Sequence, residues 1–147
     1  ATKEVAVATG FSYRYYRLKD YTGDFVIKQW RLFSGSGQTG TDISATLTSS
    51  TANASYPASR VRDNDYNSAA ILEGSDSWVK LDLGGSPTTL QSMQIKMTYT
   101  YLDRGKFEGS NTGAFSGEET VLIDGPAGGW GIDADTATDS DGAYAIG

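Results

Sequence analysis

Side chains of the types that bind sugars lie in turn-like stretches of the sequence. An aromatic ring can stack on the apolar face of a sugar, and Arg and Asn side chains can hydrogen-bond its hydroxyl groups. Trp130 stands in a Gly128-Gly129-Trp130-Gly131 segment without bulky sequence neighbours, so it either fills an edge of the core or projects toward a partner. The other candidate ligand-binding residues are Tyr66, Asn67, Arg60, Arg62 and Arg104.

Few residues are available for catalysis. The sequence has no His and no Cys, which excludes Ser-His-Asp and Cys-His chemistry, ordinary zinc sites and disulfides. Its 18 Asp and Glu residues would allow the paired carboxylates of a glycosidase, but neither spacing nor context singles out a pair. The sequence therefore predicts a protein that is not an enzyme.

The balance of charge and hydropathy limits the classes of partner. A formal net charge of −6 repels phosphate backbones, which disfavours nucleic acid as a partner. Basic residues do gather near the start of the chain, but they alternate with aromatic residues, and we interpret them as a solvated sheet face: Arg14, Arg17, Lys19, Lys28 and Arg31. No apolar run approaches the ~20 residues of a membrane-spanning helix, so we expect no membrane insertion.

The elements that must position these side chains are predicted to be strands. Apolar and polar residues alternate with a period of two, most clearly in 90–101, where Met93, Ile95 and Met97 share one face. The predicted strands are Glu4–Thr9, Ser12–Asp20, Phe25–Phe33, Asp42–Thr48, Trp78–Leu83, Leu90–Tyr101 and Glu119–Ile123. Many short strands separated by turns predict a β-sandwich or jelly roll.

The segments between the strands carry weaker signals. Residues 58–62 are predicted to form one short turn, and 34–41 reads as a Gly/Ser linker. The end of the chain, 124–147, is rich in glycine and then acidic, and we interpret it as loop and tail. Together these features predict one all-β domain over residues 1–147.

Three strings resemble the discoidin family, which includes the C-type domains of coagulation factors V and VIII and many galactose-binding-like modules. The first runs from Tyr56-Pro57-Ala58-Ser59 through Asp63-Asn64-Asp65 and Ser68 to Trp78-Val79-Lys80-Leu81-Asp82-Leu83-Gly84. The second is Phe107-Glu108-Gly109-Ser110-Asn111. The third pairs Tyr13-Arg14-Tyr15-Tyr16-Arg17-Leu18 with Val26-Ile27-Lys28-Gln29-Trp30-Arg31-Leu32-Phe33. Together they cover about two-thirds of the chain and imply a discoidin-like sandwich.

The order of the strings differs from that of the family. The third string resembles the strand pair that ends the family's domain, yet here it begins the chain, which implies a circularly permuted strand order. Residues 1–33 would then either close their own sandwich across the 34–41 linker or complete that of a neighbouring subunit in a homo-oligomer. We favour closure within the chain.

The resemblance also implies a structural calcium site. Asp63, Asp65 and Ser68 match the family's metal-binding loop, and Ca²⁺ binds six to eight oxygen ligands. Asn64 stands where the family has Gly, although Asn tolerates a left-handed backbone. Gln29 stands where a glutamate often completes the ligand set, which lowers the charge of the site.

The expected function follows from the fold and from the absence of catalytic residues. We expect a non-catalytic binding or attachment module that recognises a glycan or another surface polymer, located outside cells or on a virion surface. The alternative is a structural virion protein, such as a phage head-decoration or tail-fibre component, whose partners are other virion proteins.

Overall fold

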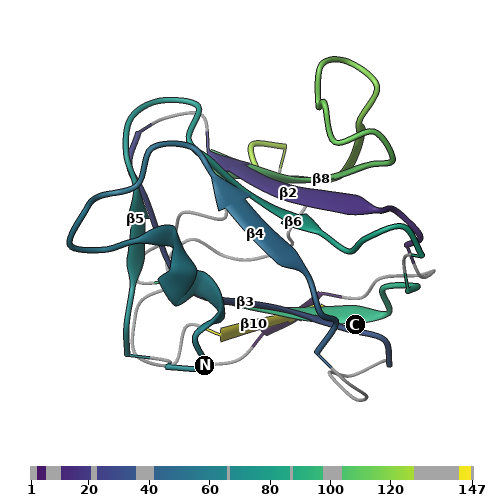
Figure 1. The fold of residues 1–147 in the computed structure, drawn as a ribbon, viewed down its shortest axis with the longest axis horizontal. Helices are drawn as coiled ribbons and strands as arrows, with labels where there is room; N and C mark the ends of the chain where they lie inside the picture. The colour runs from purple at the N-terminus through teal and green to yellow at the C-terminus, as the bar shows by residue number, and fades with distance from the viewer. Residues whose placement is uncertain are drawn as a thin grey trace.

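Two five-stranded sheets pack face to face in the computed structural model (Figure 1). The structure describes residues 3–5, 11–20, 23–35, 42–65, 67–86, 88–97, 104–127 and 143–146. In the first sheet the strand order is β1 (Lys3–Val5), β10 (Ala143–Ile146), β7 (Ser92–Met97), β3 (Phe25–Phe33), β5 (Ala70–Leu72). In the second it is β4 (Thr46–Ser49), β6 (Trp78–Asp82), β2 (Tyr15–Asp20), β8 (Gly105–Ser110), β9 (Thr120–Asp124). All neighbouring strands are antiparallel except β1 and β10, which are parallel.

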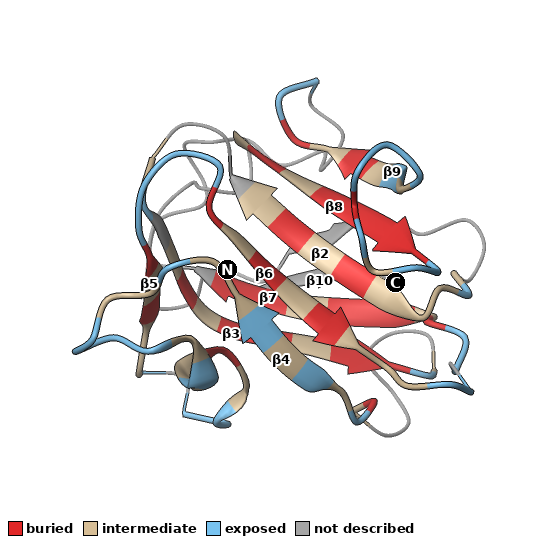
Figure 2. Cartoon of the chain, turned by 45° about the horizontal axis from the view of Figure 1, so that its top comes forward, coloured by how far each residue is buried: buried red, intermediate tan, exposed pale blue. Residues whose placement is uncertain are grey.

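The sequence alternation decides which side chains enter the space between the sheets. In β6, Val79 and Leu81 are fully buried, while Trp78 and Lys80, which alternate with them, are only partly buried. Because successive side chains of a strand point to opposite faces, Val79 and Leu81 face the other sheet and Trp78 and Lys80 face outward. Figure 2 shows the same alternation of buried and partly buried residues along β2 and β6.

Aromatic side chains from both sheets form the centre of the core. Trp30, Tyr16 and Phe107 are each at most 1% exposed. The Tyr16 and Phe107 rings stack at 5.4 Å between centroids, and Trp30 meets Phe107 edge to face at 6.3 Å. Offset and edge-to-face contacts of this kind add to the stabilisation from burial alone. Trp30 lies on β3 and the other two rings on β2 and β8, so these contacts join the two sheets.

The first 33 residues supply an interior strand to each sheet. Strand β2 lies between β6 and β8, and β3 lies between β7 and β5. The expectation that residues 12–20 and 25–33 belong to the same sandwich as Trp78–Leu83 and Leu90–Tyr101 is therefore confirmed. So is the all-β sandwich itself: the short 3₁₀ helix η2 (Ala58–Arg62) lies where a turn was predicted, and the described part of the chain contains no α-helix.

The structure corrects the expectation for the end of the chain. Residues 124–147 were predicted to be loop and tail, but Asp124 ends β9 and Ala143–Ile146 form β10. Strand β10 pairs with β7 on one side and with β1 on the other, so the end of the chain is part of the first sheet. Four residues are too few for their alternation to stand out from loop sequence, and the pairing of strands distant in sequence decides this element instead.

Other strand boundaries also shift. Strand β4 begins at Thr46 rather than Asp42, and β5 was not predicted because it has only three residues. Parts of two predicted strands, 6–9 and 98–101, lie outside the described residues. No helix within the described ranges is long and apolar enough to span a membrane.

Candidate functional site

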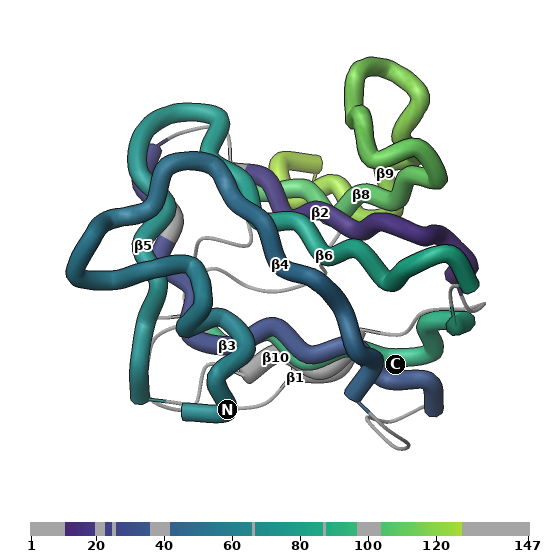
Figure 3. Tube along the Cα trace, in the orientation of Figure 1, coloured from purple at the N-terminus to yellow at the C-terminus, as the bar shows by residue number. Residues whose placement is uncertain are grey.

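The outer face of the second sheet carries an unusual mixture of aromatic and basic side chains. Strand β2 contributes Tyr15 and Arg17, and the adjacent strand β6 contributes Trp78 and Lys80, all only partly buried. The register of the two strands pairs Arg17 with Lys80, so these side chains stand side by side. The segment 111–119, which connects β8 to β9, rises over this face (Figure 3).

A single carboxylate organises the β8–β9 connection. One oxygen of Glu118 accepts hydrogen bonds from the Ser110 hydroxyl (2.7 Å), the Thr112 hydroxyl and the Phe115 backbone N–H (3.0 Å). The hydrogen bonds from Thr112 and Ser110 hold the pKa of Glu118 below its ordinary value, although desolvation acts in the opposite direction. This arrangement accommodates Phe115 in a left-handed backbone conformation with φ 50°.

We expect Glu118→Gln to lower the melting temperature, because a neutral amide accepts these hydrogen bonds more weakly than a carboxylate. A lowered pKa in the folded state means that the stabilisation is present above the ordinary pKa of 4.5 and is lost as the pH falls through the folded-state pKa. The difference in melting temperature between wild type and variant should therefore shrink on acidification from pH 7 to about pH 3. A difference that is constant over this range would show that the charge of Glu118 contributes nothing.

The two basic side chains of this face are held in fixed positions. The Arg17 guanidinium donates to the Glu108 carboxylate at 2.8 Å, and both side chains are almost fully covered, with 11% and 3% exposure. The Phe115 ring lies over the same guanidinium, 4.4 Å from its carbon to the ring centroid. The Lys80 ammonium donates to the Gly113 carbonyl at 3.2 Å and lies 5.5 Å from the centroid of the Trp78 ring. Lys80 forms no ion pair within the described part of the chain.

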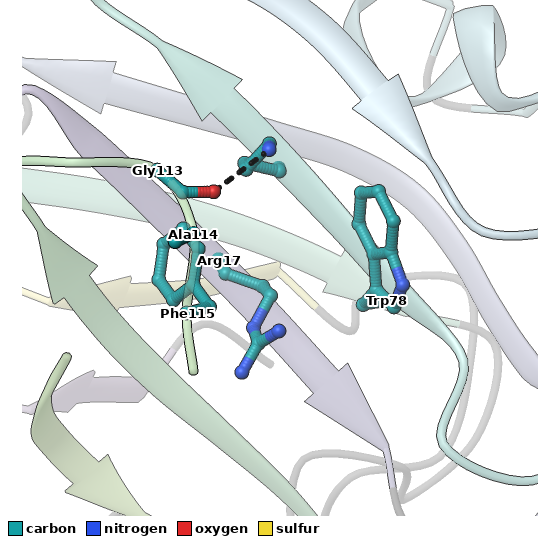
Figure 4. Close-up of a pocket in the computed structure, with 6 residues that line it drawn as sticks. Arg17, Trp78, Gly113, Ala114 and Phe115 are labelled. Carbon is teal, nitrogen blue, oxygen red and sulfur yellow. Dashed lines mark hydrogen bonds between the residues drawn. The ribbon is translucent and has the colours of Figure 1, made fainter. Parts of the chain in front are cut away.

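These side chains border a small surface hollow of about 150 Å³ (Figure 4). Its lining consists of Arg17, Trp78, Lys80, Gly113, Ala114 and Phe115. Trp78 stands on one side of the hollow, and Ala114 and Phe115 of the β8–β9 connection stand on the other. The hollow thus combines a partly buried indole with an ammonium group that forms no ion pair within the described ranges.

Most cations around the hollow are neutralised. Arg14 pairs with Asp82 at 2.9 Å, and the Arg14 hydrogen bond lowers the pKa of that carboxyl. The lysines at the far end of β2 and at the start of β8 are also near carboxylates: Lys19–Asp76 at 3.8 Å and Lys106–Asp124 at 3.9 Å. The face is therefore not a continuous basic stripe. The predicted solvated face does not form as one surface, because Arg17 and Lys19 lie on β2 and Lys28 and Arg31 on β3 of the other sheet, and the Arg17 side chain is only 11% exposed.

The structure does not gather the predicted ligand-binding residues into one site. Trp130 and Tyr66 lie outside the described residues. Asn67 is exposed, and the Arg60 guanidinium lies 5.3 Å from the centroid of the Tyr56 ring. Arg104 precedes β8 in the second sheet, whereas Arg60 lies in η2, which packs mainly against β3 and β5 of the first sheet.

Arg62 serves the fold rather than an open surface. Its guanidinium donates to the Trp30 carbonyl at 3.0 Å, to the Ile43 carbonyl at 2.6 Å and to the Asp42 carboxylate at 3.2 Å. Only 15% of its side chain is exposed. The sequence shows an arginine in a turn but not that three acceptors surround it.

The residues predicted to bind calcium do lie together. Asp63 accepts hydrogen bonds from the Asp65 N–H at 2.9 Å, the Ser68 hydroxyl at 2.5 Å and the Gln29 amide at 2.7 Å. Asn64 has φ 62°, so it adopts the left-handed conformation that the loop requires. Burial raises the pKa of Asp63, but the hydrogen bonds from Ser68, Asp65 and Gln29 outweigh it and lower the pKa overall.

In the structure these groups are not oriented to bind a divalent cation together. The Asp65 carboxylate turns to accept the Asn67 N–H at 2.9 Å, which leaves Asp63 as the carboxylate on the Gln29 side. The Gln29 side chain presents its N–H₂ group, a donor, to the loop oxygens. No group of three His, Cys, Asp or Glu residues suited to a metal occurs in the ranges that the structure describes. Calcium binding here stays a prediction.

The sequence analysis did not predict the hollow, because the residues that line it were interpreted as belonging to separate features. Trp78 belongs to a string that reads as a structural strand, and Arg17 belongs to a basic cluster on another strand. Period-two alternation does place Trp78 and Lys80 on one face, which is a usable signal. That this face meets Arg17 and Phe115 depends on strand pairing and on the loop held by Glu118.

The chain was compared with protein-family models, with curated proteins and with solved structures, and none of the three comparisons finds a match. The discoidin resemblance therefore stays a prediction, and the functional argument depends on the geometry of the site.

Proposed function

We propose that the chain is a non-catalytic carbohydrate-binding module that attaches to a glycan or a related surface polymer through the hollow on its second sheet. The observation that carries the proposal is a partly buried Trp78 indole on the outer face of β6, beside a Lys80 ammonium held by the Gly113 carbonyl. An indole offers a flat apolar surface for the C–H face of a sugar. The ammonium has three N–H groups, so it can donate to a sugar oxygen while it keeps its bond to Gly113.

Rigidity supports the proposal. The Arg17–Glu108 pair and the Phe115 ring fix one wall of the hollow, and the hydrogen bonds to Glu118 fix the loop that carries Phe115. A site that is ordered before the ligand arrives loses less conformational entropy on binding. The small volume of the hollow suits one sugar residue or a chain end, with the rest of the polymer outside it.

The charges around the hollow favour a sugar over nucleic acid. The chain carries a net charge of −6, and Arg14, Lys19 and Lys106 each lie beside a carboxylate. Affinity for a phosphate backbone depends on several cations that release counterions together. Lys80, which forms no ion pair in the part of the chain that the structure describes, supports selection of a single oxygen or carboxylate instead. The proposed location is outside cells or on a virion surface, where glycans and surface polymers are available.

A glycan array tests this function. We expect wild type to bind a defined subset of glycans and Trp78→Ala to lose that signal, because the variant removes the stacking surface and leaves the core intact. Tyr56→Ala is the matched control, since Tyr56 is an exposed aromatic (43%) beside Arg60, on the segment that packs against the first sheet. Loss of signal in both variants, or in neither, would contradict binding at the hollow.

The alternative proposal is a structural role in a virion. Strand β9 is an edge of the second sheet, and its Val121 is 45% exposed, so this edge could meet another subunit or another virion protein. A wild-type protein that is silent on every glycan and multimeric by light scattering would favour this role over sugar binding.

A further inference from the structure

The Gln29 side chain occupies a point at which three oxygens converge. Its amide nitrogen donates to the Asp63 carboxylate at 2.7 Å, to the Arg60 carbonyl at 3.3 Å and to the Asp65 carbonyl at 3.3 Å. Gln29 is fully buried, and its amide oxygen is buried without a hydrogen-bond partner in the described structure. The position of the Gln29 side chain is therefore explained by the hydrogen bonds that its amide nitrogen donates.

A bulge in β3 points Gln29 at this loop. Opposite β7, Ile27 pairs with Met97 and Gln29 with Lys96, so Lys28 is an extra residue on β3. Such a bulge changes the direction of the side chains around it. As a result, Gln29 and its neighbour Trp30 are both fully buried.

Electrostatics explains why a donor is required at this point. Three oxygens that face one another repel unless a positive group lies between them, either a cation or N–H groups. The opposite orientation of the Gln29 amide would add a fourth oxygen to the cluster. With the nitrogen inward, the two N–H groups of the amide are shared among the Asp63, Arg60 and Asp65 oxygens and add to the hydrogen bonds that Asp63 and Asp65 accept from within the turn.

We infer that the Gln29 amide takes the place of a bound cation, so that the turn carrying Arg60, Asp63 and Asp65 is closed by the protein alone and its folding does not depend on calcium. The cost of this arrangement is one buried amide oxygen without a hydrogen-bond partner among the described residues. The benefit is a binding module whose scaffold keeps its shape at any calcium concentration. The inference is independent of the proposed sugar site, which lies on the other sheet.

The same geometry predicts how the loop can be converted into a metal site. Gln29→Glu replaces the amide donor with a second carboxylate facing Asp63, beside the carbonyl oxygens of Arg60 and Asp65. Two carboxylates and several neutral oxygens are a ligand set that Ca²⁺ accepts. Without a cation the two carboxylates repel each other, so this variant should depend on calcium for its stability.

Thermal unfolding of wild type and Gln29→Glu, in excess Ca²⁺ and in chelator, tests the inference. Wild type should melt at the same temperature in both media. Gln29→Glu should melt lower in chelator and recover in Ca²⁺, because a ligand that binds only the native state stabilises it. The control Gln29→Glu/Asp63→Asn should lose most of the recovery.

Two results would overturn the inference. The first is a wild type that chelator destabilises and Ca²⁺ restores, which would establish the predicted calcium site instead. The second is a folded Gln29→Glu protein that is indifferent to Ca²⁺. If Gln29→Glu folds in neither medium, Gln29→Leu replaces it: removal of the donor should lower the melting temperature equally in Ca²⁺ and in chelator, and a decrease confined to chelator would contradict the inference.

Discussion

Removal of residues 1–33 will leave a chain that does not fold. The deletion takes away β2 from between β6 and β8, and β3 from between β7 and β5, so both sheets lose an interior strand. It also removes Tyr16 and Trp30, two of the three aromatic rings at the centre of the core. Circular dichroism should show loss of the β-sheet signal.

This deletion also distinguishes two roles of residues 1–33: closing the sandwich of their own chain, or completing the sandwich of a neighbouring subunit. If residues 1–33 closed a neighbour's sandwich, the remainder would stay soluble, and a peptide of residues 1–33 would restore assembly. A truncated chain that is folded and monomeric would contradict both the account of the core and closure within the chain.

Trp30→Ala is expected to have the second-largest effect. Trp30 is fully buried between the sheets, in contact with Phe107 and with its indole N–H directed at the Met93 sulfur at 3.5 Å. Truncation of a buried Trp leaves a cavity and costs about 3–5 kcal/mol. For a domain with a typical stability of about 5–15 kcal/mol, a loss of that size leaves little margin. Urea unfolding followed by circular dichroism measures it.

Trp78→Ala is the matched control for the same chemical change. Trp78 lies on the outer face of β6 and is only partly buried, so its truncation creates no cavity between the sheets. The expected loss of unfolding free energy is about 1 kcal/mol or less, as for most surface substitutions. Equal losses for the two variants would contradict the assignment of Trp30 to the core and Trp78 to the surface.

Period-two alternation was enough to predict the fold class and most strands. Residues 78–83 were predicted to form a strand, and β6 (Trp78–Asp82) agrees, although the sequence analysis did not single out Trp78 as facing outward. The same reasoning missed β10 and β5, because strands of three or four residues carry too little pattern. Their existence depends on pairing with β7 and β3, which are distant in sequence.

The candidate sites were predictable to different degrees. The residues around Asp63 do meet Gln29 as the sequence string implies, because a tight loop and a strand string fix that neighbourhood. What could not be predicted was that an amide nitrogen, rather than an oxygen, would point into the loop. The hollow between Trp78 and Phe115 was missed because it depends on a loop held by Glu118.

The central proposal is that ligand binds at the hollow of Trp78; the glycine-flanked Trp130, which the sequence suggested, lies outside the described residues and is tested beside it. Isothermal titration of a glycan that binds the wild type, with Trp78→Ala and Trp130→Ala in parallel, tests this directly. We predict that Trp78→Ala weakens binding about tenfold or more, equivalent to about 1.4 kcal/mol, and that Trp130→Ala stays within about twofold of wild type. Loss of binding in Trp130→Ala with full affinity in Trp78→Ala would contradict the account.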